Sequence, residues 1–234
     1  QVDNSFKLAI KNTNSFGGIT DINWSVYDIS SSGILDWGSG AWGGIISHEE
    51  SFNQDLNGDG GIGLSASALT SAAGDTTGAK LKRDSDKALY IDKDGDDSTS
   101  NDLLLISDEF GGSPTFDHVD KWSEGTNESS FSEESIAVEE QADGTYQLAI
   151  KSTDTYNSEV NTNWNTYNVS KDGVINWSTA TWGSISKQEQ KFNQDLNLDG
   201  VVGVNTSLNA ITTDTTGAKL RMDSDKVLPE RTTL

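Results

Sequence analysis

An internal repeat with a period of 140 residues constrains this chain of 234 residues more than any other feature of its sequence. Residues 1–63 align with residues 141–203 without a gap, and 26 of the 63 positions are identical. After a one-residue slip the match resumes, with DTTGAKLKRDSDKAL from Asp75 set against DTTGAKLRMDSDKVL from Asp214. A repeat of this kind indicates that one structural unit occurs twice.

Residues 91–140 lie between the two copies and have no counterpart in the chain. The runs LLLISD and SIAVEE in this segment are typical of strands rather than of a linker. We therefore interpret the chain as part of a longer array, with a first module at 1–106 that is truncated at its N-terminus and a second at 107–234 that is truncated at its C-terminus. Two domains joined by a linker of about 50 residues are the alternative.

The start of each copy is typical of an antiparallel meander. In the first copy FKLAIK, INWSVYDIS and GILDWGSGAWG are apolar-rich runs separated by polar turns, and the second copy repeats the pattern. Gly33 and Gly173 supply a turn conformation that a residue with a Cβ would resist. A further hairpin is expected over AKLKRDSDKALYI, with Asp-Ser-Asp at its turn.

A short helix is expected after each meander, over ISHEESFNQ and ISKQEQKFNQ. Ser47 and Ser186 are the expected N-caps, Glu follows in the first turns, and no β-branched residue comes after the cap. The predicted fold class is therefore mainly β. It consists of tandem antiparallel β-rich modules, each with one short helix that leads into an EF-hand-like calcium loop.

The helices lead into FNQDLNGDG at residues 52–60 and FNQDLNLDG at residues 192–200. Both contain D-x-N-x-D-G, in which alternate residues of a curled loop point oxygen atoms at one hard cation and Gly permits the bend. The seventh loop residue would add its backbone carbonyl. The predicted calcium ligands are thus Asp55, Asn57, Asp59 and Gly61 in the first loop and Asp195, Asn197, Asp199 and Val201 in the second. A plain turn is the alternative, because Asp, Asn and Gly also favour turns.

The twelfth loop position departs from the EF-hand pattern, because Ala66 and Thr206 stand where an EF-hand has a bidentate Glu. The last ligand must then be water or an acidic residue from elsewhere, and the candidates are Glu49, Glu189, Asp75 and Asp214. A weaker candidate metal site is the turn DKDGDD, with Asp92, Asp94 and Asp96.

The charge of the chain favours cations as partners. With 37 acidic and 16 basic residues the formal net charge is −21, which argues against nucleic acid and anionic membranes as partners. The chain has no Cys, so thiolate chemistry and thiolate metal sites are excluded. It also lacks an apolar run of about 18 residues, so we expect no membrane insertion.

The seven tryptophans have two interpretations, a core and a sugar-binding surface. Trp37 and Trp42 are five residues apart and would face opposite sides of a regular strand, so we expect core positions rather than one stacking platform. A carbohydrate-binding module with exposed Trp side chains is the alternative function. His48 and His118 are isolated and no nucleophile-elbow or zinc-protease motif occurs, so we expect no enzyme.

Each copy contains the same series of motifs: a strand like YQLAIK, then NW, then a run like G-x-I-x-W and a later W, and finally a Glu-containing helix that ends in a block like FNQDLNGDG. This series resembles the tryptophan-rich C-terminal domain family of cyanobacterial and other bacterial secreted proteins. The resemblance covers about 63 residues in each of two copies. It implies a large secreted or surface-associated protein with several such modules, and it implies no reaction.

These observations together predict a calcium-binding structural repeat module of a large extracellular or cell-surface bacterial protein, such as an adhesin or a surface-layer-like protein. Calcium would rigidify each module. The expected partners are calcium, surface glycans and neighbouring repeats of the same protein.

Overall fold

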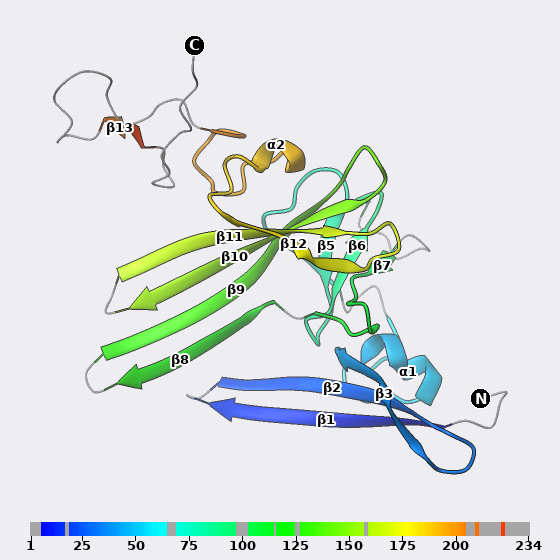
Figure 1. The fold of residues 1–234 in the computed structure, drawn as a ribbon. Coiled ribbons are helices and arrows are strands. Elements are labelled where there is room, and N and C mark those ends of the chain that lie inside the picture. The colour runs from blue at the N-terminus through cyan, green and yellow to red at the C-terminus, as the bar shows by residue number, and fades with distance from the viewer. Residues whose placement is uncertain are drawn as a thin grey trace.

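A computed structural model shows that the chain is mainly β, as the sequence predicts (Figure 1). The structure describes residues 6–16, 19–64, 69–96, 103–114, 116–124, 127–156, 159–204, 209–210 and 221–222. Their strands form antiparallel sheets of three, five, four and two strands.

The three-stranded sheet is the expected meander of the first copy. Its strands are β1 (Phe6–Phe16), β2 (Ile19–Ile29) and β3 (Leu35–Gly43), in the order β1-β2-β3. Gly33, in the turn before β3, has a φ of 84°, which confirms the predicted need for glycine there. The helix α1 (Ile46–Phe52) follows. Its N-cap is Ile45 without a side-chain bond, so the expected cap at Ser47 is wrong: Ser47 lies inside the helix.

The five-stranded sheet contains the meander of the second copy and two strands from the segment between the copies. In the order β12-β11-β10-β9-β8, its members are β8 (His118–Glu124), β9 (Asn127–Glu140), β10 (Tyr146–Tyr156), β11 (Glu159–Val169) and β12 (Ile175–Gly183). β10 and β11 pair in the register of β1 and β2: Leu148 lies opposite Tyr167, as Leu8 lies opposite Tyr27.

The second helix, α2 (Glu189–Phe192), is only four residues long and has Gln188 as its N-cap. The expected cap at Ser186 is therefore wrong as well. Both helices end instead on an asparagine with a left-handed backbone, Asn53 with φ 52° and Asn193 with φ 50°. Asn is one of the few residues other than Gly that tolerates this conformation, so FNQ marks the end of each helix.

The four-stranded sheet belongs to the end of the first copy and the segment after it. It contains β4 (Thr70–Ser71), β5 (Lys80–Arg83), β6 (Leu89–Asp92) and β7 (Leu103–Leu105). The β5–β6 hairpin turns at Asp-Ser-Asp, as predicted. The remaining described strands are β13 (Asn209–Ala210) and β14 (Arg221–Met222).

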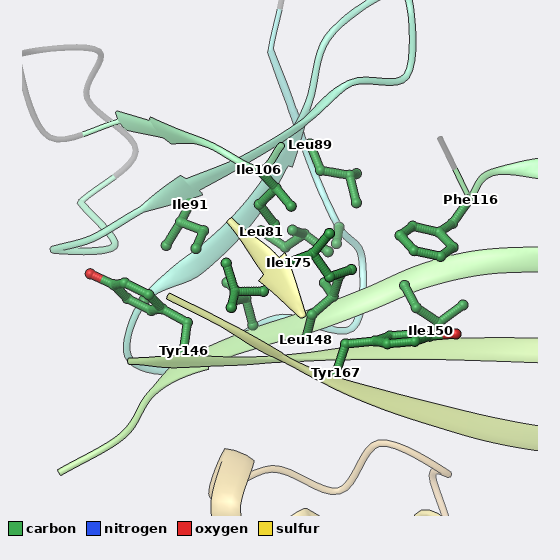
Figure 2. Packing of buried hydrophobic residues seen from close by; sticks show 14 residues of the cluster. Leu81, Leu89, Ile91, Ile106, Phe116, Tyr146, Leu148, Ile150, Tyr167 and Ile175 are labelled. Carbon is green, nitrogen blue, oxygen red and sulfur yellow. The ribbon is translucent and has the colours of Figure 1, made fainter. Parts of the chain in front are cut away.

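The largest core cluster lies between the β5–β6 hairpin and the five-stranded sheet (Figure 2). Leu81, Leu89 and Ile91 from the hairpin are fully buried against residues such as Leu148 and Ile150 of β10. Ile106 and Phe116 belong to the same cluster, although the expected module boundary runs between residues 106 and 107. The end of the first sequence copy thus packs on the start of the second.

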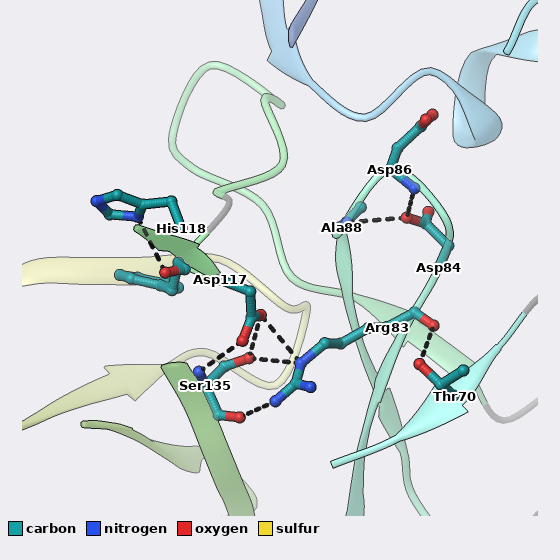
Figure 3. Close-up of polar contacts among 9 residues, drawn as sticks. Thr70, Arg83, Asp84, Asp86, Ala88, Asp117, His118 and Ser135 are labelled. Atoms are coloured by element: carbon teal, nitrogen blue, oxygen red, sulfur yellow. Dashed lines mark hydrogen bonds and ion pairs between the residues drawn. The ribbon is translucent and has the colours of Figure 1, made fainter. Parts of the chain in front are cut away.

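A polar network supports the same contact between β5 and β9 (Figure 3). Arg83 Nε lies 2.9 Å from Asp117 Oδ2 and donates to Ser135 Oγ at 2.9 Å, and the guanidinium also donates to the Ser135 carbonyl. The Ser135 hydroxyl in turn donates to Asp117 at 2.7 Å. Charge-assisted bonds of this kind are stronger than neutral ones, so the network fixes the hairpin on the sheet.

Candidate functional site

The first predicted calcium loop starts at the end of α1, and its side chains curl its own backbone. Asp55 accepts the N–H of Gly58 at 2.7 Å and that of Gly60 at 3.0 Å. Asn57 Oδ1 accepts the N–H of Asp59 at 3.0 Å. Gly60 has a φ of 93°, so the sixth position needs glycine as the motif predicts.

The second loop repeats this arrangement. Asp195 accepts the N–H of Asp199 at 3.1 Å and that of Gly200 at 2.7 Å. Asp199 accepts the N–H of Val201 at 2.9 Å, just as Asp59 accepts that of Gly61 at 2.9 Å. The two nine-residue blocks therefore fold in the same way despite their different surroundings.

The residue that differs between the two blocks lies at a strained position. Gly58 has a φ of 84°, and its counterpart Leu198 has a φ of 62° with a side chain that is 84% exposed. A leucine in the left-handed region costs about 1 kcal/mol relative to glycine. The second loop therefore carries strain that the first one lacks.

Two buried glutamates close the loops, a role that sequence analysis missed. Glu49 is fully buried, and its Oε1 accepts the N–H groups of Leu56 (2.8 Å) and Asn57 (3.2 Å), while Oε2 accepts that of Gly63 (3.0 Å). Glu189 binds the second loop in the same way, through the N–H groups of Leu196, Asn197 and Gly203. These carboxylates join the start of each loop to its end. Their spacing from the loop gives no sequence signal beyond the repetition of Glu in both copies.

The carboxylate of Asp75, a further candidate ligand, is used elsewhere. It accepts the N–H groups of Leu81 at 2.6 Å and Val138 at 3.0 Å and the side-chain amide of Gln194 at 2.9 Å. Burial raises the pKa of Asp75 to about 6, although these bonds oppose the shift. Asp75 thus joins β5 and β9 to the residue before the second loop, rather than completing the first loop. Asp214, Ala66 and Thr206 lie outside the described residues.

The Asp-Ser-Asp turn brings another carboxylate to the first loop. Asp84 shapes this turn by accepting the N–H groups of Asp86 and Ala88, both at 2.9 Å (Figure 3). Asp86 Oδ2 then accepts the N–H of Ile45 at 3.0 Å and lies 3.3 Å from Asn57 Nδ2. Sequence reasoning missed Asp86, because it stands 27 positions after Asp59 and only the tertiary fold brings it to the loop.

The two loops carry the types of oxygen donor that a hard cation takes. Each loop offers two carboxylates and one amide oxygen at positions 1, 3 and 5, together with the carbonyl of Gly61 or Val201. The bonds to backbone N–H groups use only part of the acceptor capacity, because a carboxylate has about four lone-pair sites. These residues would hold Ca²⁺.

The carboxylates of the weaker candidate site come together, whereas those of the two loops are not found as such a group among the described residues. Among the described residues, Asp92, Asp94 and Asp96 form the group of three whose ligand atoms all lie within 4.8 Å of one another. Asp92 is fully buried, and its Oδ2 lies 3.5 Å from Lys82 Nζ. An ion there would have to share Asp92 with this ammonium group.

The tryptophans are divided between the core and the surface. Trp24 and Trp164 are buried, as expected, but Trp37 is 72% exposed and Trp42 is 55% exposed, so the core assignment is wrong for them. The reason is an irregularity in the β2–β3 pairing, where four residues of β3 lie opposite Tyr27 alone. Both rings then pack edge-to-face on Tyr27, at centroid distances of 5.4 and 6.2 Å. Trp177 and Trp182 of the second copy are also exposed.

An open cavity of ≈ 440 Å³ lies where the three-stranded sheet meets the five-stranded one. Its aromatic lining residues are Trp42, Phe116, Tyr167 and Trp177, and its polar side chains are Asn23, Asp108, Ser113 and Glu133. Burial raises the pKa of Glu133, opposed by nearby His118. The volume and the mixture of aromatic and polar groups are typical of small-molecule sites.

Comparisons of this chain with protein-family models, with curated proteins and with solved structures gave no match. The resemblance to the tryptophan-rich family therefore stays a prediction. Within the described part of the chain, no helix has both the length and the apolar character that crossing a membrane requires.

Proposed function

We propose that this chain is a calcium-stabilised structural repeat of a large extracellular or cell-surface bacterial protein, adhesin- or surface-layer-like, without catalytic activity. The observation that carries the proposal is the pair of loops. Each has oxygen donors at positions 1, 3 and 5, a bond from the N–H of the sixth residue to the first Asp, and a fully buried glutamate that ties its ends. Such agreement is expected of a repeated site rather than of two unrelated turns.

Calcium would stabilise the folded chain in two ways, by neutralising negative charge and by holding the first loop against the β5–β6 turn. The net charge of −21 strains the compact state, and an ion that binds only the folded form stabilises it by mass action. In the first loop the ion would also rigidify the contact with the β5–β6 turn, because Asn57 lies beside Asp86. We propose Asp86 as the residue that replaces the missing twelfth ligand.

The incomplete ligand set supports an extracellular location. A loop without the bidentate glutamate has lost its strongest ligand, so its affinity belongs to the weak class of extracellular modules, with dissociation constants on the order of 10⁻⁴–10⁻³ M. Such sites fill in a calcium-rich medium and stay empty at cytosolic calcium concentrations. The 140-residue period supports the tandem-array part of this proposal.

Calorimetric titration with calcium and melting curves test this proposal. We expect a stoichiometry of about two, one ion per loop, or three if the Asp92 cluster also binds. Replacing both Asp55→Asn and Asp195→Asn should abolish the calcium-dependent rise in melting temperature. Asp172→Asn, in an exposed turn, is the matched control and should leave it intact. A melting temperature that is the same in millimolar calcium and in excess chelator would sink the proposal.

A second candidate function, glycan binding, is favoured by the aromatic cavity. Exposed Trp42 and Trp177 offer ring faces, and Asn23, Asp108 and Glu133 offer hydrogen-bonding groups for hydroxyls. A glycan array should then show binding that Trp42→Ala and Trp177→Ala each reduce at least tenfold. Trp122→Ala removes an exposed ring outside the cavity and should have no effect. An array without any bound glycan would rule this candidate out.

A further inference from the structure

The first strands of the two copies, β1 and β10, differ in the number of strands that pair with them. β10 is paired on both sides, with β11 and with β9, whereas β1 is paired with β2 and, among the described residues, with no strand on its other edge (Figure 1). β1 is 11 residues long. An edge of this length is a template for a further strand, and proteins rarely leave one open without protection.

Each copy has an apolar cluster between its sheet and its helix, and β9 supplies residues only to the cluster of the second copy. In the second copy Ala149, Trp164, Ile185, Phe192 and Leu196 are buried together. Their counterparts at the 140-residue offset also cluster in the first copy: Ala9, Trp24, Ile45, Phe52 and Leu56. The second cluster additionally contains Ile136 and Ala137 of β9.

This cluster is more deeply buried in the second copy, where β9 is present, than in the first. Phe192 is completely buried and Leu196 is 6% exposed, whereas Phe52 and Leu56 are only partly buried. On the other face of the sheet, Leu148 and Ile150 are completely buried and Leu8 and Ile10 only partly so, but the hairpin residues Leu81, Leu89 and Ile91 also belong to the cluster of Leu148 and Ile150. The first copy therefore has the same apolar surfaces as the second and lacks one strand of cover within the described chain.

We propose that the free edge of β1 binds, in antiparallel register, a strand with the sequence of β9 from another copy of this repeat unit. The pairing observed between β9 and β10 fixes the register at the 140-residue offset. Leu8 would lie opposite the position of Val138, Ala9 opposite that of Ala137 and Lys11 opposite that of Glu134. This inference rests on the repeat-array part of the proposed function and is independent of calcium.

The occupant is identified by its charge as well as by its pattern. Residues 127–140 contain five glutamates and no basic residue, whereas β1 carries Lys7 and Lys11. In the observed register these two lysines would face the positions of Glu139 and Glu134. Lys7 replaces Gln147 of β10 and forms an ion pair with Asp28 of β2 at 2.7 Å, so its ammonium group would be shared between Asp28 and the glutamate of the incoming strand.

Hydrogen exchange on the full chain tests this inference, with a synthetic peptide of residues 127–140 as the probe. We expect the peptide at saturating concentration to slow exchange of the β1 amides that do not bond to β2 by at least tenfold. A control peptide with Ala137→Pro and Val138→Pro should give no protection. Two successive prolines remove the N–H donors on both sides of the strand, and the chain itself is unchanged.

Three results would overturn the inference: unchanged exchange in β1, equal protection by both peptides, or changes confined to β10, where the peptide would only replace β9. The exchange is measured both in millimolar calcium and in excess chelator. If the peptide protects β1 but calcium does not change the melting temperature, the calcium proposal is contradicted and the strand-binding inference is supported. If calcium raises the melting temperature but the peptide does not protect β1, the strand-binding inference is contradicted and the calcium proposal is supported.

Discussion

The region β1–β3 with α1 and the region β10–β12 with α2 have the same strand register and the same loop, yet they differ in burial. Phe192 is completely buried where Phe52 is partly exposed, and Leu148 is completely buried where Leu8 is not. The apolar cover comes from β9 and from the β5–β6 hairpin, which pack on the second region, whereas the hairpin reaches the first region through the polar contacts of Asp86. Local sequence therefore sets the form of each region, and its neighbours set its stability.

The sharpest test of this difference is the pair Phe192→Ala and Phe52→Ala. Truncation of the fully buried Phe192 should lower the free energy of unfolding by about 3–5 kcal/mol. Truncation of Phe52 should cost about 1–2 kcal/mol, because less apolar area is lost. Urea unfolding measures both. Equal losses would show that the two regions are covered alike.

A change of pH should act on the second region. The pKa of Asp75 is raised to about 6 by burial, and that of Glu139 to about 7 by burial and by the negative charge of Asp75. Protonation then favours the folded state, so this contribution to stability is complete below about pH 4 and is lost as the pH rises through about 6 for Asp75 and about 7 for Glu139. For Asp75 the loss amounts to at most about 3 kcal/mol.

Native-state hydrogen exchange between pH 4 and pH 7 measures this effect in each region. We expect the protection of β10, corrected for intrinsic exchange rates, to fall relative to that of β1 as the pH rises. Asp75→Asn should flatten the difference. A pH profile that is the same for β1 and β10 would contradict the assignment of Asp75 to the second region.

Arg83→Met tests the network that fixes the hairpin to β9. The sequence offers this change itself, because Met222 stands at the matching position of the second copy. Loss of the guanidinium removes the cation beside Asp117 and the donor to the fully buried Ser135, which then keep their bonds to each other, at a cost of about 2 kcal/mol. Lys121→Met, on the exposed side of β8, is the control and should cost less than about 0.5 kcal/mol. Chemical denaturation that fails to separate the two variants would contradict a structural role for the network.

The smallest expected effect concerns the loops, where the two regions differ at one position of the block. Leu198→Gly should raise the free energy of unfolding by about 1 kcal/mol, because it relieves a left-handed leucine whose side chain is exposed. Gly58→Leu should lower it by a similar amount. Thermal melting in chelator isolates this backbone effect from calcium. Changes of the same sign in both variants would exclude backbone strain as the cause.

The strands and turns could be predicted because their signals are local. FKLAIK and YQLAIK form strands, and the glycines at 33 and 173 have the positive φ that their turns require. The helix caps could not, because Ser47 and Ser186 offered a plausible cap that the backbone does not use. Trp37 and Trp42 were misplaced because alternation fails at an irregular strand pairing, which the sequence does not reveal.

The candidate calcium loops show the same division. Asp55, Asn57 and Asp59 with Gly60 could be proposed as a loop site from the sequence, because the ligands of such a loop would follow one another at fixed spacing. Asp86 and the anchoring role of Glu49 were not, because long-range contacts define them. The functional assignment of these loops stays a prediction.

The sequence by itself determined that this chain is mainly β and that its repeated segments fold alike, because strand pattern, turn glycines and loop spacing act over a few residues. Only the tertiary structure decided that the end of the first copy packs on the second, leaving β1 with one free edge among the described residues. The physical reason is that an apolar strand face specifies that it must be covered, but not by which segment. That choice depends on long-range packing, which identical local sequences cannot distinguish.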